Sequence, residues 1–170
     1  MKRKVLTNVS ERVCIFAGSF DPVTNGHMDV IRRASALFDR VYVAVLINCN
    51  KKGWLSVGQR TELLRIACAG MQKVEVGSYD GMVKDLAREK NAVCLIRGSR
   101  TGTEFETECT TAELNRHLLP GLETIILPAT PGLAAVSSSA VREILSFGGD
   151  ISGLVPDSIL PALIRANLQC

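Results

Sequence analysis

The chain has 170 residues, of which 46% are hydrophobic and 22% charged, and its formal net charge at pH 7 is +3. This length and composition predict one globular domain over residues 1–170, with residues 1–10 as a basic leader. The mild positive charge does not indicate nucleic-acid binding, although it suits a small polyanionic substrate. No apolar run reaches the ~20 residues that cross a bilayer. We therefore expect neither a nucleic acid nor a membrane as a partner.

The cysteines do not form a recognisable metal or redox motif. Six are present, at positions 14, 49, 68, 94, 109 and 170. No two of them form a CxxC pair, and no Cys/His cluster has zinc spacing. Cys14 and Cys94 lie inside apolar runs, where a thiol behaves as a small hydrophobic group. The pattern favours reduced thiols in a cytoplasmic protein.

Along the chain, strand and helix patterns alternate. Short apolar runs predict strands at residues 12–17, 41–47, 73–77, 92–97 and 123–127. Helical periodicity predicts helices at residues 27–38, 57–69, 81–90, 103–118 and 139–147, followed by a C-terminal helix that Pro156 opens. Such alternation with short connections indicates an α/β fold, a doubly wound five-stranded parallel sheet of the Rossmann-like type. Ligands of such sheets bind beyond the carboxyl ends of the strands.

The connection between the first strand and the first helix carries the most specific motif. Residues 18–27 read GSFDPVTNGH. A glycine-bearing turn before a helix exposes backbone N–H groups to an anion, and His27 adds a side-chain donor. The motif is neither G-x-G-x-x-G nor the P-loop. It resembles the T/S-x-G-H signature of the nucleotidylyltransferase superfamily; the alternative is an ordinary βα turn with a capping histidine.

Further polar segments follow the other strands and should meet the motif in one crevice. Lys51 and Lys52 follow the second strand, and Arg97 and Arg100 flank a glycine after the fourth. Both pairs suit phosphate binding, with surface charge as the alternative. Glu104, Glu106 and Glu108 open the next helix; helix-dipole pairing explains the first two, whereas Glu108 is better placed to reach a ribose. The last segment is a serine run at 137–139, which caps the fifth helix and can also cradle a triphosphate.

Together these segments resemble the phosphopantetheine adenylyltransferase family of coenzyme A synthesis. The matching stretches are residues 17–27, Lys51-Lys52, LIRGSR at 95–100, FETE at 105–108, LNRHL at 114–118 and VSSS at 136–139. The family implies a nucleotidylyltransferase fold and transfer of AMP from ATP to 4′-phosphopantetheine, giving dephospho-coenzyme A and pyrophosphate. It also implies Mg²⁺, a homohexamer and coenzyme A as a feedback ligand.

The resemblance also implies roles for individual residues. Ser19 and His27 would contact the reacting phosphates, with His27 stabilising the transition state. Ser19, Lys51, Val83 and Arg97 would bind phosphopantetheine. The residues expected to bind ATP are Ser19, Phe20, His27, Gly98, Ser99, Arg100, Glu108, Leu133, Ala134, Ala135, Val136, Ser137, Ser138 and Ser139. No paired carboxylates mark a metal position, so the metal ligands are unknown.

Three alternatives remain open at this stage. A sister nucleotidylyltransferase would use nicotinamide mononucleotide or a cytidylyl acceptor. A non-catalytic nucleotide-binding module would bind ATP without releasing pyrophosphate. A fragment of a tRNA synthetase is the third, although nothing in the sequence supplies an anticodon-reading domain or a long basic surface.

Overall fold

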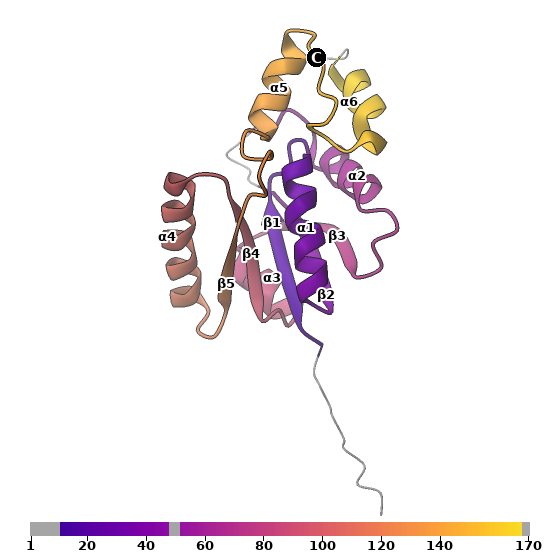
Figure 1. The fold of residues 1–170 in the computed structure, drawn as a ribbon. Coiled ribbons are helices and arrows are strands. Elements are labelled where there is room, and N and C mark those ends of the chain that lie inside the picture. Colours follow the sequence, from indigo (N-terminus) through magenta and orange to yellow (C-terminus); the bar gives the residue numbers. More distant parts are fainter. Residues whose placement is uncertain (1–10, 48–51, 168–170) are drawn as a thin grey trace, which may run out of the picture.

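The computed structural model describes residues 11–47 and 52–167, which form an α/β fold around one parallel sheet (Figure 1). The strands are β1 (Val13–Gly18), β2 (Arg40–Ile47), β3 (Val74–Asp80), β4 (Cys94–Ser99) and β5 (Glu123–Pro128). The helices are α1 (Asn25–Leu37), α2 (Val57–Ala67), α3 (Val83–Glu89), α4 (Gly102–Leu118), α5 (Ser138–Ser146), the 3₁₀ helix η1 (Asp157–Ile159) and α6 (Leu160–Asn167). The predicted fold class is confirmed.

Alternation along the strands divides the core into two layers. Cys14 and Phe16 of β1 belong to the larger cluster, which α1, α2, α5, η1 and α6 cover. Ile15 and Ala17 point to the smaller cluster, which includes Leu86 of α3. Because both faces of the central strands are buried, the strands read as continuous apolar runs rather than as an alternating pattern.

The order of the strands fixes where a ligand can bind. The sheet runs β3-β2-β1-β4-β5, so the chain moves outward from β1 and then returns to place β4 on its other side. The pairing of β1 with β4 ends at Phe16 and Ile96, although β1 continues to Gly18 and β4 to Ser99. The two strands therefore separate at their carboxyl ends and open a crevice at the switch point. Helices α5 and α6 lie above this end of the sheet (Figure 1).

The strand boundaries differ from the predicted ones where pairing with a neighbouring strand extends a strand. Strand β3 reaches Asp80 because its parallel pairing with β2 continues to Ile47. Strand β4 includes Arg97 to Ser99, which pair with Ile126 to Pro128 of β5, so these residues end the strand instead of following it. In the described ranges, the structure has no helix that combines the length and apolarity needed to span a membrane.

Candidate active site

A cavity of about 340 Å³ lies at the switch point, which is a usual size for a small-molecule site. Its walls come from the end of β1, the start of α1, the end of β4, and the connection from β5 to α5. The predicted site residues that line it are Ser19, Phe20, His27, Arg97, Gly98, Ser99, Arg100, Leu133, Val136, Ser137, Ser138 and Ser139. Segments far apart in the sequence thus meet in one cavity.

The other predicted site residues are not among those that line the cavity. Lys51 falls outside the described residues. Val83 begins α3 and packs against the smaller core cluster. Glu108 lies on α4 and reaches the cavity only through Arg97. Ala134 and Ala135 are exposed in the connection before α5 and are absent from the cavity lining.

The motif after β1 is held in an unusual backbone conformation. Phe20 has a φ of 47°, in the left-handed region that costs energy for a residue with a side chain. Its buried ring compensates by packing edge-on against Phe16, with 5.3 Å between centroids, and against His27, at 5.0 Å. Gly18 makes room for this ring, because a Cβ there would lie 3.3 Å from it. Phe20 therefore supports the imidazole from behind.

Two side chains that the sequence did not single out anchor the same loop. The buried carboxylate of Asp21 accepts hydrogen bonds from the backbone N–H groups of Trp54, at 2.8 Å, and Leu55, at 2.9 Å. Buried Arg60 on α2 donates to the carbonyl of Ser19 at 3.0 Å. These contacts join the motif to the segment between β2 and α2. No local pattern indicates either contact, because the partners are 33 to 41 residues apart.

His27 is fixed as a neutral hydrogen-bond donor. Its Nδ1 accepts the backbone N–H of Thr24 at 3.0 Å, while the Thr24 hydroxyl caps α1. Since a backbone N–H can only donate, Nδ1 carries no proton and the proton lies on Nε2. Burial lowers the pKa of His27 to about 4, and the charges of Arg100 and Arg97 add to the shift. Near neutral pH the site therefore offers an N–H donor rather than a cation.

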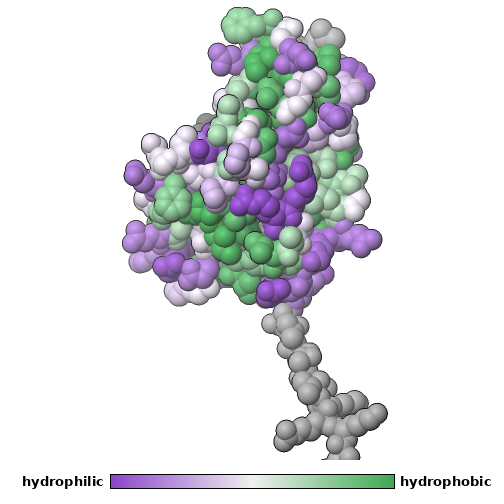
Figure 2. All heavy atoms as spheres, viewed as in Figure 1, coloured by the Kyte–Doolittle hydropathy of each residue, from purple (hydrophilic) through white to green (hydrophobic). Residues whose placement is uncertain are grey.

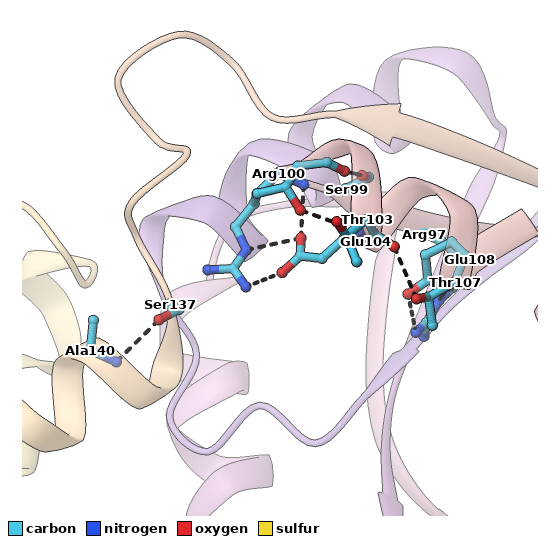
Figure 3. Close-up of polar contacts among 10 residues, drawn as sticks. Arg97, Ser99, Arg100, Thr103, Glu104, Thr107, Glu108, Ser137 and Ala140 are labelled. Atoms are coloured by element: carbon cyan, nitrogen blue, oxygen red, sulfur yellow. Dashed lines mark hydrogen bonds and ion pairs between the residues drawn. The ribbon is translucent and has the colours of Figure 1, made fainter.

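Arg97 connects the two strands of the crevice to α4. Its guanidinium forms a two-point ion pair with Glu108, with both N···O distances 2.7 Å (Figure 3). It also donates to the carbonyl of Ala17 at 2.7 Å. Glu108 was expected to bind a ribose directly. In the structure its carboxylate holds the Arg97 guanidinium as a bidentate acceptor, with 15% of its side chain exposed.

Arg100 is the second cation of the cavity and is paired as well. Its guanidinium and backbone N–H both contact Glu104, four residues along (Figure 3). The helix-dipole explanation for Glu104 is therefore incomplete, because this carboxylate also holds Arg100. Both side chains remain 36% exposed, so the pair is accessible to water and to an incoming anion.

The serine run combines capping with access to the cavity. Ser137 caps α5 by accepting the N–H of Ala140 at 3.1 Å, and Ser138 donates to the carbonyl of Pro22 at 2.7 Å. Arg142 donates to Ser139 and to the carbonyl of Asp21, which joins α5 to the motif loop. These contacts hold the start of α5 against the loop after β1. A helix N-terminus beside a cavity favours a negatively charged ligand.

The described residues contain no large cluster of metal-ligating side chains. No group of three or more His, Cys, Asp or Glu side chains that could hold an ion occurs in the described ranges. Asp29 is the carboxylate on the cavity wall, and its Oδ2 already accepts hydrogen bonds from Arg33 and Thr130. Mg²⁺ that arrives bound to a triphosphate needs no protein cage, since it keeps several waters and phosphate oxygens.

Comparison with known proteins agrees with this geometry. The model of the cytidylyltransferase-like family matches residues 15–144. A phosphopantetheine adenylyltransferase of Shouchella clausii is 44% identical over 149 residues, covering 88% of this chain and 94% of the relative. One from Rubrobacter xylanophilus is 47% identical over 87% of this chain and 90% of the relative, and one from Clostridium perfringens is 43% identical over 89% and 93%.

A solved structure supports the fold separately. The crystal structure of a candidate nicotinate-nucleotide adenylyltransferase from Vibrio parahaemolyticus superposes with a TM-score of 0.69 at 17% identity, covering 93% of this chain and 94% of that one. At that identity the likeness extends to the fold alone. The family model and the sequence relatives establish the family as well. The chain belongs to the cytidylyltransferase-like family and, within it, to the phosphopantetheine adenylyltransferases.

Proposed function

We propose that this protein transfers AMP from ATP to 4′-phosphopantetheine, giving dephospho-coenzyme A and pyrophosphate. The observation that carries the proposal is the convergence of Ser19, His27, Arg97, Arg100 and the serine run on one cavity at the switch point. Both reactants are anions, and these side chains offer donors and positive charge from both walls. The relatives' shared name supplies the acceptor.

The chemistry needs no nucleophile from the protein. A phosphate oxygen of the acceptor attacks the α-phosphorus of ATP, a new P–O bond forms, and the bond to the β-phosphate breaks as pyrophosphate leaves with its electron pair. Negative charge builds on the oxygens of the α-phosphate in the transition state. A neutral imidazole with Nε2–H directed at these oxygens stabilises that charge without needing to reorganise. Alignment of the two reactants supplies much of the remaining rate.

The two reactants occupy neighbouring parts of the cavity. Arg97, together with Lys51 and Ser19, holds the 4′-phosphate, and Val83 lies along the pantetheine arm. ATP lies against Gly98, Ser99, Arg100 and residues 133–139, with Phe20 supporting His27. The pairing of Arg97 with Glu108 supports a second role for this carboxylate, which orients Arg97 and accepts a ribose hydroxyl of ATP.

We also propose the metal, the cellular compartment and the feedback ligand of this reaction. Mg²⁺ enters as part of the ATP substrate. We place the protein in the cytoplasm, where Cys14 and Cys94, whose pKa values burial raises to about 12 and 11, stay as unreactive thiols. Coenzyme A, which contains the product's groups, is the expected feedback ligand.

A homohexamer is proposed on the family resemblance, and an apolar surface supports self-association. Helix α4 buries none of its 17 residues, all of which the structure describes, and Phe105 and Leu114 are 49% and 57% exposed. Apolar surface also gathers over β4 and β5 beside α4, where Ile125 is exposed (Figure 2). Such a patch marks an interface more often than a free surface. Light scattering of the purified protein measures the number of subunits.

One assay tests the proposed reaction. Pyrophosphate release from ATP and Mg²⁺ is measured with 4′-phosphopantetheine, with nicotinamide mononucleotide, and without an acceptor. We expect release only with 4′-phosphopantetheine. Release with nicotinamide mononucleotide alone would assign a sister reaction. ATP binding without release in any arm would make the protein a nucleotide-binding module.

A further inference from the structure

The connection from β5 to α5 forms part of the cavity wall, and a backbone hydrogen bond of 2.8 Å from Ala129 to the carbonyl of Ser99 joins its first residue to β4. Ala129, Leu133 and Val136 of this connection line the cavity, and much of residues 128–135 is exposed. Two of its backbone hydrogen bonds are internal, from Leu133 to Thr130 and from Val136 to Leu133. A segment built this way needs an outside anchor to keep one conformation against a ligand.

Helix α1 provides such an anchor through three side chains. Arg33 donates to Asp29 at 3.1 Å and to the carbonyl of Pro128 at 2.7 Å. The same Oδ2 of Asp29 accepts the hydroxyl of Thr130 at 2.9 Å, across 101 residues of sequence. The last residue of β5 and Thr130, the second residue of the connection, are thus both tied to one turn of α1.

The anchor is rigid because α1 is part of the core. Met28, Val30, Ile31 and Ala34 of this helix are buried. The same helix carries His27, two residues before Asp29. Its position therefore sets both the imidazole and the connection that lies over the nucleotide side of the cavity.

Charge balance explains why Asp29 can stand in a site for anions. Its side chain is 15% exposed and lies on the cavity wall. A bare carboxylate there would repel the phosphates of ATP, whereas pairing with Arg33 compensates its charge. The hydroxyl of Thr130 donates to the same Oδ2 and so ties the connection to the compensated carboxylate.

We propose that Asp29, Arg33 and Thr130 form a latch that holds the β5–α5 connection in its ATP-binding position. They are positioning residues, acting through Leu133, Val136 and the serine run. The proposal rests on the proposed function for the identity of the nucleotide. It predicts that the latch affects ATP affinity and leaves the acceptor side and the chemical step largely unchanged.

The test compares Thr130→Val, which keeps the shape of the side chain, with Thr130→Ser, which keeps the hydroxyl. Steady-state kinetics gives kcat and both KM values, and calorimetry gives the Kd for ATP without an acceptor. We expect Thr130→Val to raise the KM and Kd for ATP by about three- to tenfold, as for one lost hydrogen bond. The KM for 4′-phosphopantetheine and kcat at saturating ATP stay within about twofold, and Thr130→Ser restores ATP affinity.

Thr110→Val is the matched control, since the hydroxyl of Thr110 bonds the carbonyl of Glu106 on exposed α4. An unchanged affinity for ATP in Thr130→Val, or an equal loss in Thr130→Ser, would overturn the latch. A higher Mg²⁺ requirement in Asp29→Asn, together with unchanged ATP affinity in Thr130→Val, would also overturn it. Asp29 would then act as a metal ligand. If wild-type protein used another acceptor while Thr130→Val still weakened ATP binding, the latch would stand and the proposed reaction would fail.

Discussion

The two walls of the cavity are built in different ways. On the β1–α1 wall, Phe20 and Thr24 are buried, and Asp21 ties the loop to a distant segment. On the β4–α4 wall, Arg97 and Arg100 are held by carboxylates of a helix that buries no side chain. The first wall fixes a neutral donor in place before substrate arrives. The second keeps its cations paired until an anion competes for them.

The largest effect should come from removing the fixed donor. We expect His27→Ala to lower kcat by about 10²- to 10³-fold, the usual loss for one transition-state donor. The Kd for ATP should change little, because the donor acts on charge that develops during the reaction. Stopped-flow or steady-state pyrophosphate release measures kcat, and calorimetry measures the Kd. His117→Ala on α4 is the control. Near-normal turnover of His27→Ala would contradict the role of His27 as the fixed donor of the β1–α1 wall.

Arg97 tests the paired wall. Arg97→Ala should raise the KM for 4′-phosphopantetheine by about 10- to 100-fold, because a hydrogen bond to a charged group contributes ~1.5–3 kcal/mol. The double variant Arg97→Ala/Glu108→Gln separates this loss from the effect of a stranded carboxylate. Full recovery in the double variant, or a rise confined to the KM for ATP, would contradict the assigned subsite.

Asp21 tests how firmly the first wall is anchored. In Asp21→Asn, an amide NH₂ can face a backbone N–H of Trp54 or Leu55, which leaves a buried donor unpaired. We expect the free energy of unfolding to fall by about 1–3 kcal/mol in urea titrations. Exposed Glu62→Gln is the control and should change it by less than about 0.5 kcal/mol. Equal stability of both variants would mean that the loop does not depend on this anchor.

The smallest effect should come from freeing Arg100. Glu104→Gln removes an exposed ion pair of the kind that contributes about 0–1 kcal/mol. ATP then competes with a weaker partner, and its Kd should fall by up to about fivefold. Isothermal calorimetry at low and moderate salt measures the change. Weaker ATP binding in this variant would show that Glu104 aligns Arg100 for ATP instead of holding it back.

Local patterns predicted the frame of the site well. The apolar runs and the motif at residues 18–27 located the sheet, the crevice and most of its lining, because parallel strands bring their carboxyl ends together. Thr24 could also have been found, since a threonine three residues before His27 has capping-box spacing. The capping box also fixes the tautomer of the imidazole, because the backbone N–H of Thr24 donates to Nδ1 of His27.

The pairings within the site could not be predicted from the sequence. Glu108 meets Arg97 only because α4 turns back along β4, and Thr130 meets Asp29 across 101 residues of sequence. Such contacts depend on helix placement and on which residues have their charge compensated. Both are properties of the packed fold, so they cannot be predicted from the pattern of residue types along the chain.

Nitrogen NMR of the free protein tests the central claim, that His27 is a neutral donor set in place before substrate binds. The chain has two histidines, so ¹⁵N-histidine labelling gives two imidazole signals, and His117→Gln assigns them. We predict that His27 keeps its proton on Nε2 and stays neutral as the pH falls from 8 until it nears its lowered pKa of about 4. Because unfolded chains bind this proton at about pH 6.5, stability should fall as the pH drops through that window. Titration of His27 near pH 6.5 in the folded protein, or a proton on Nδ1 at pH 7, would contradict the account.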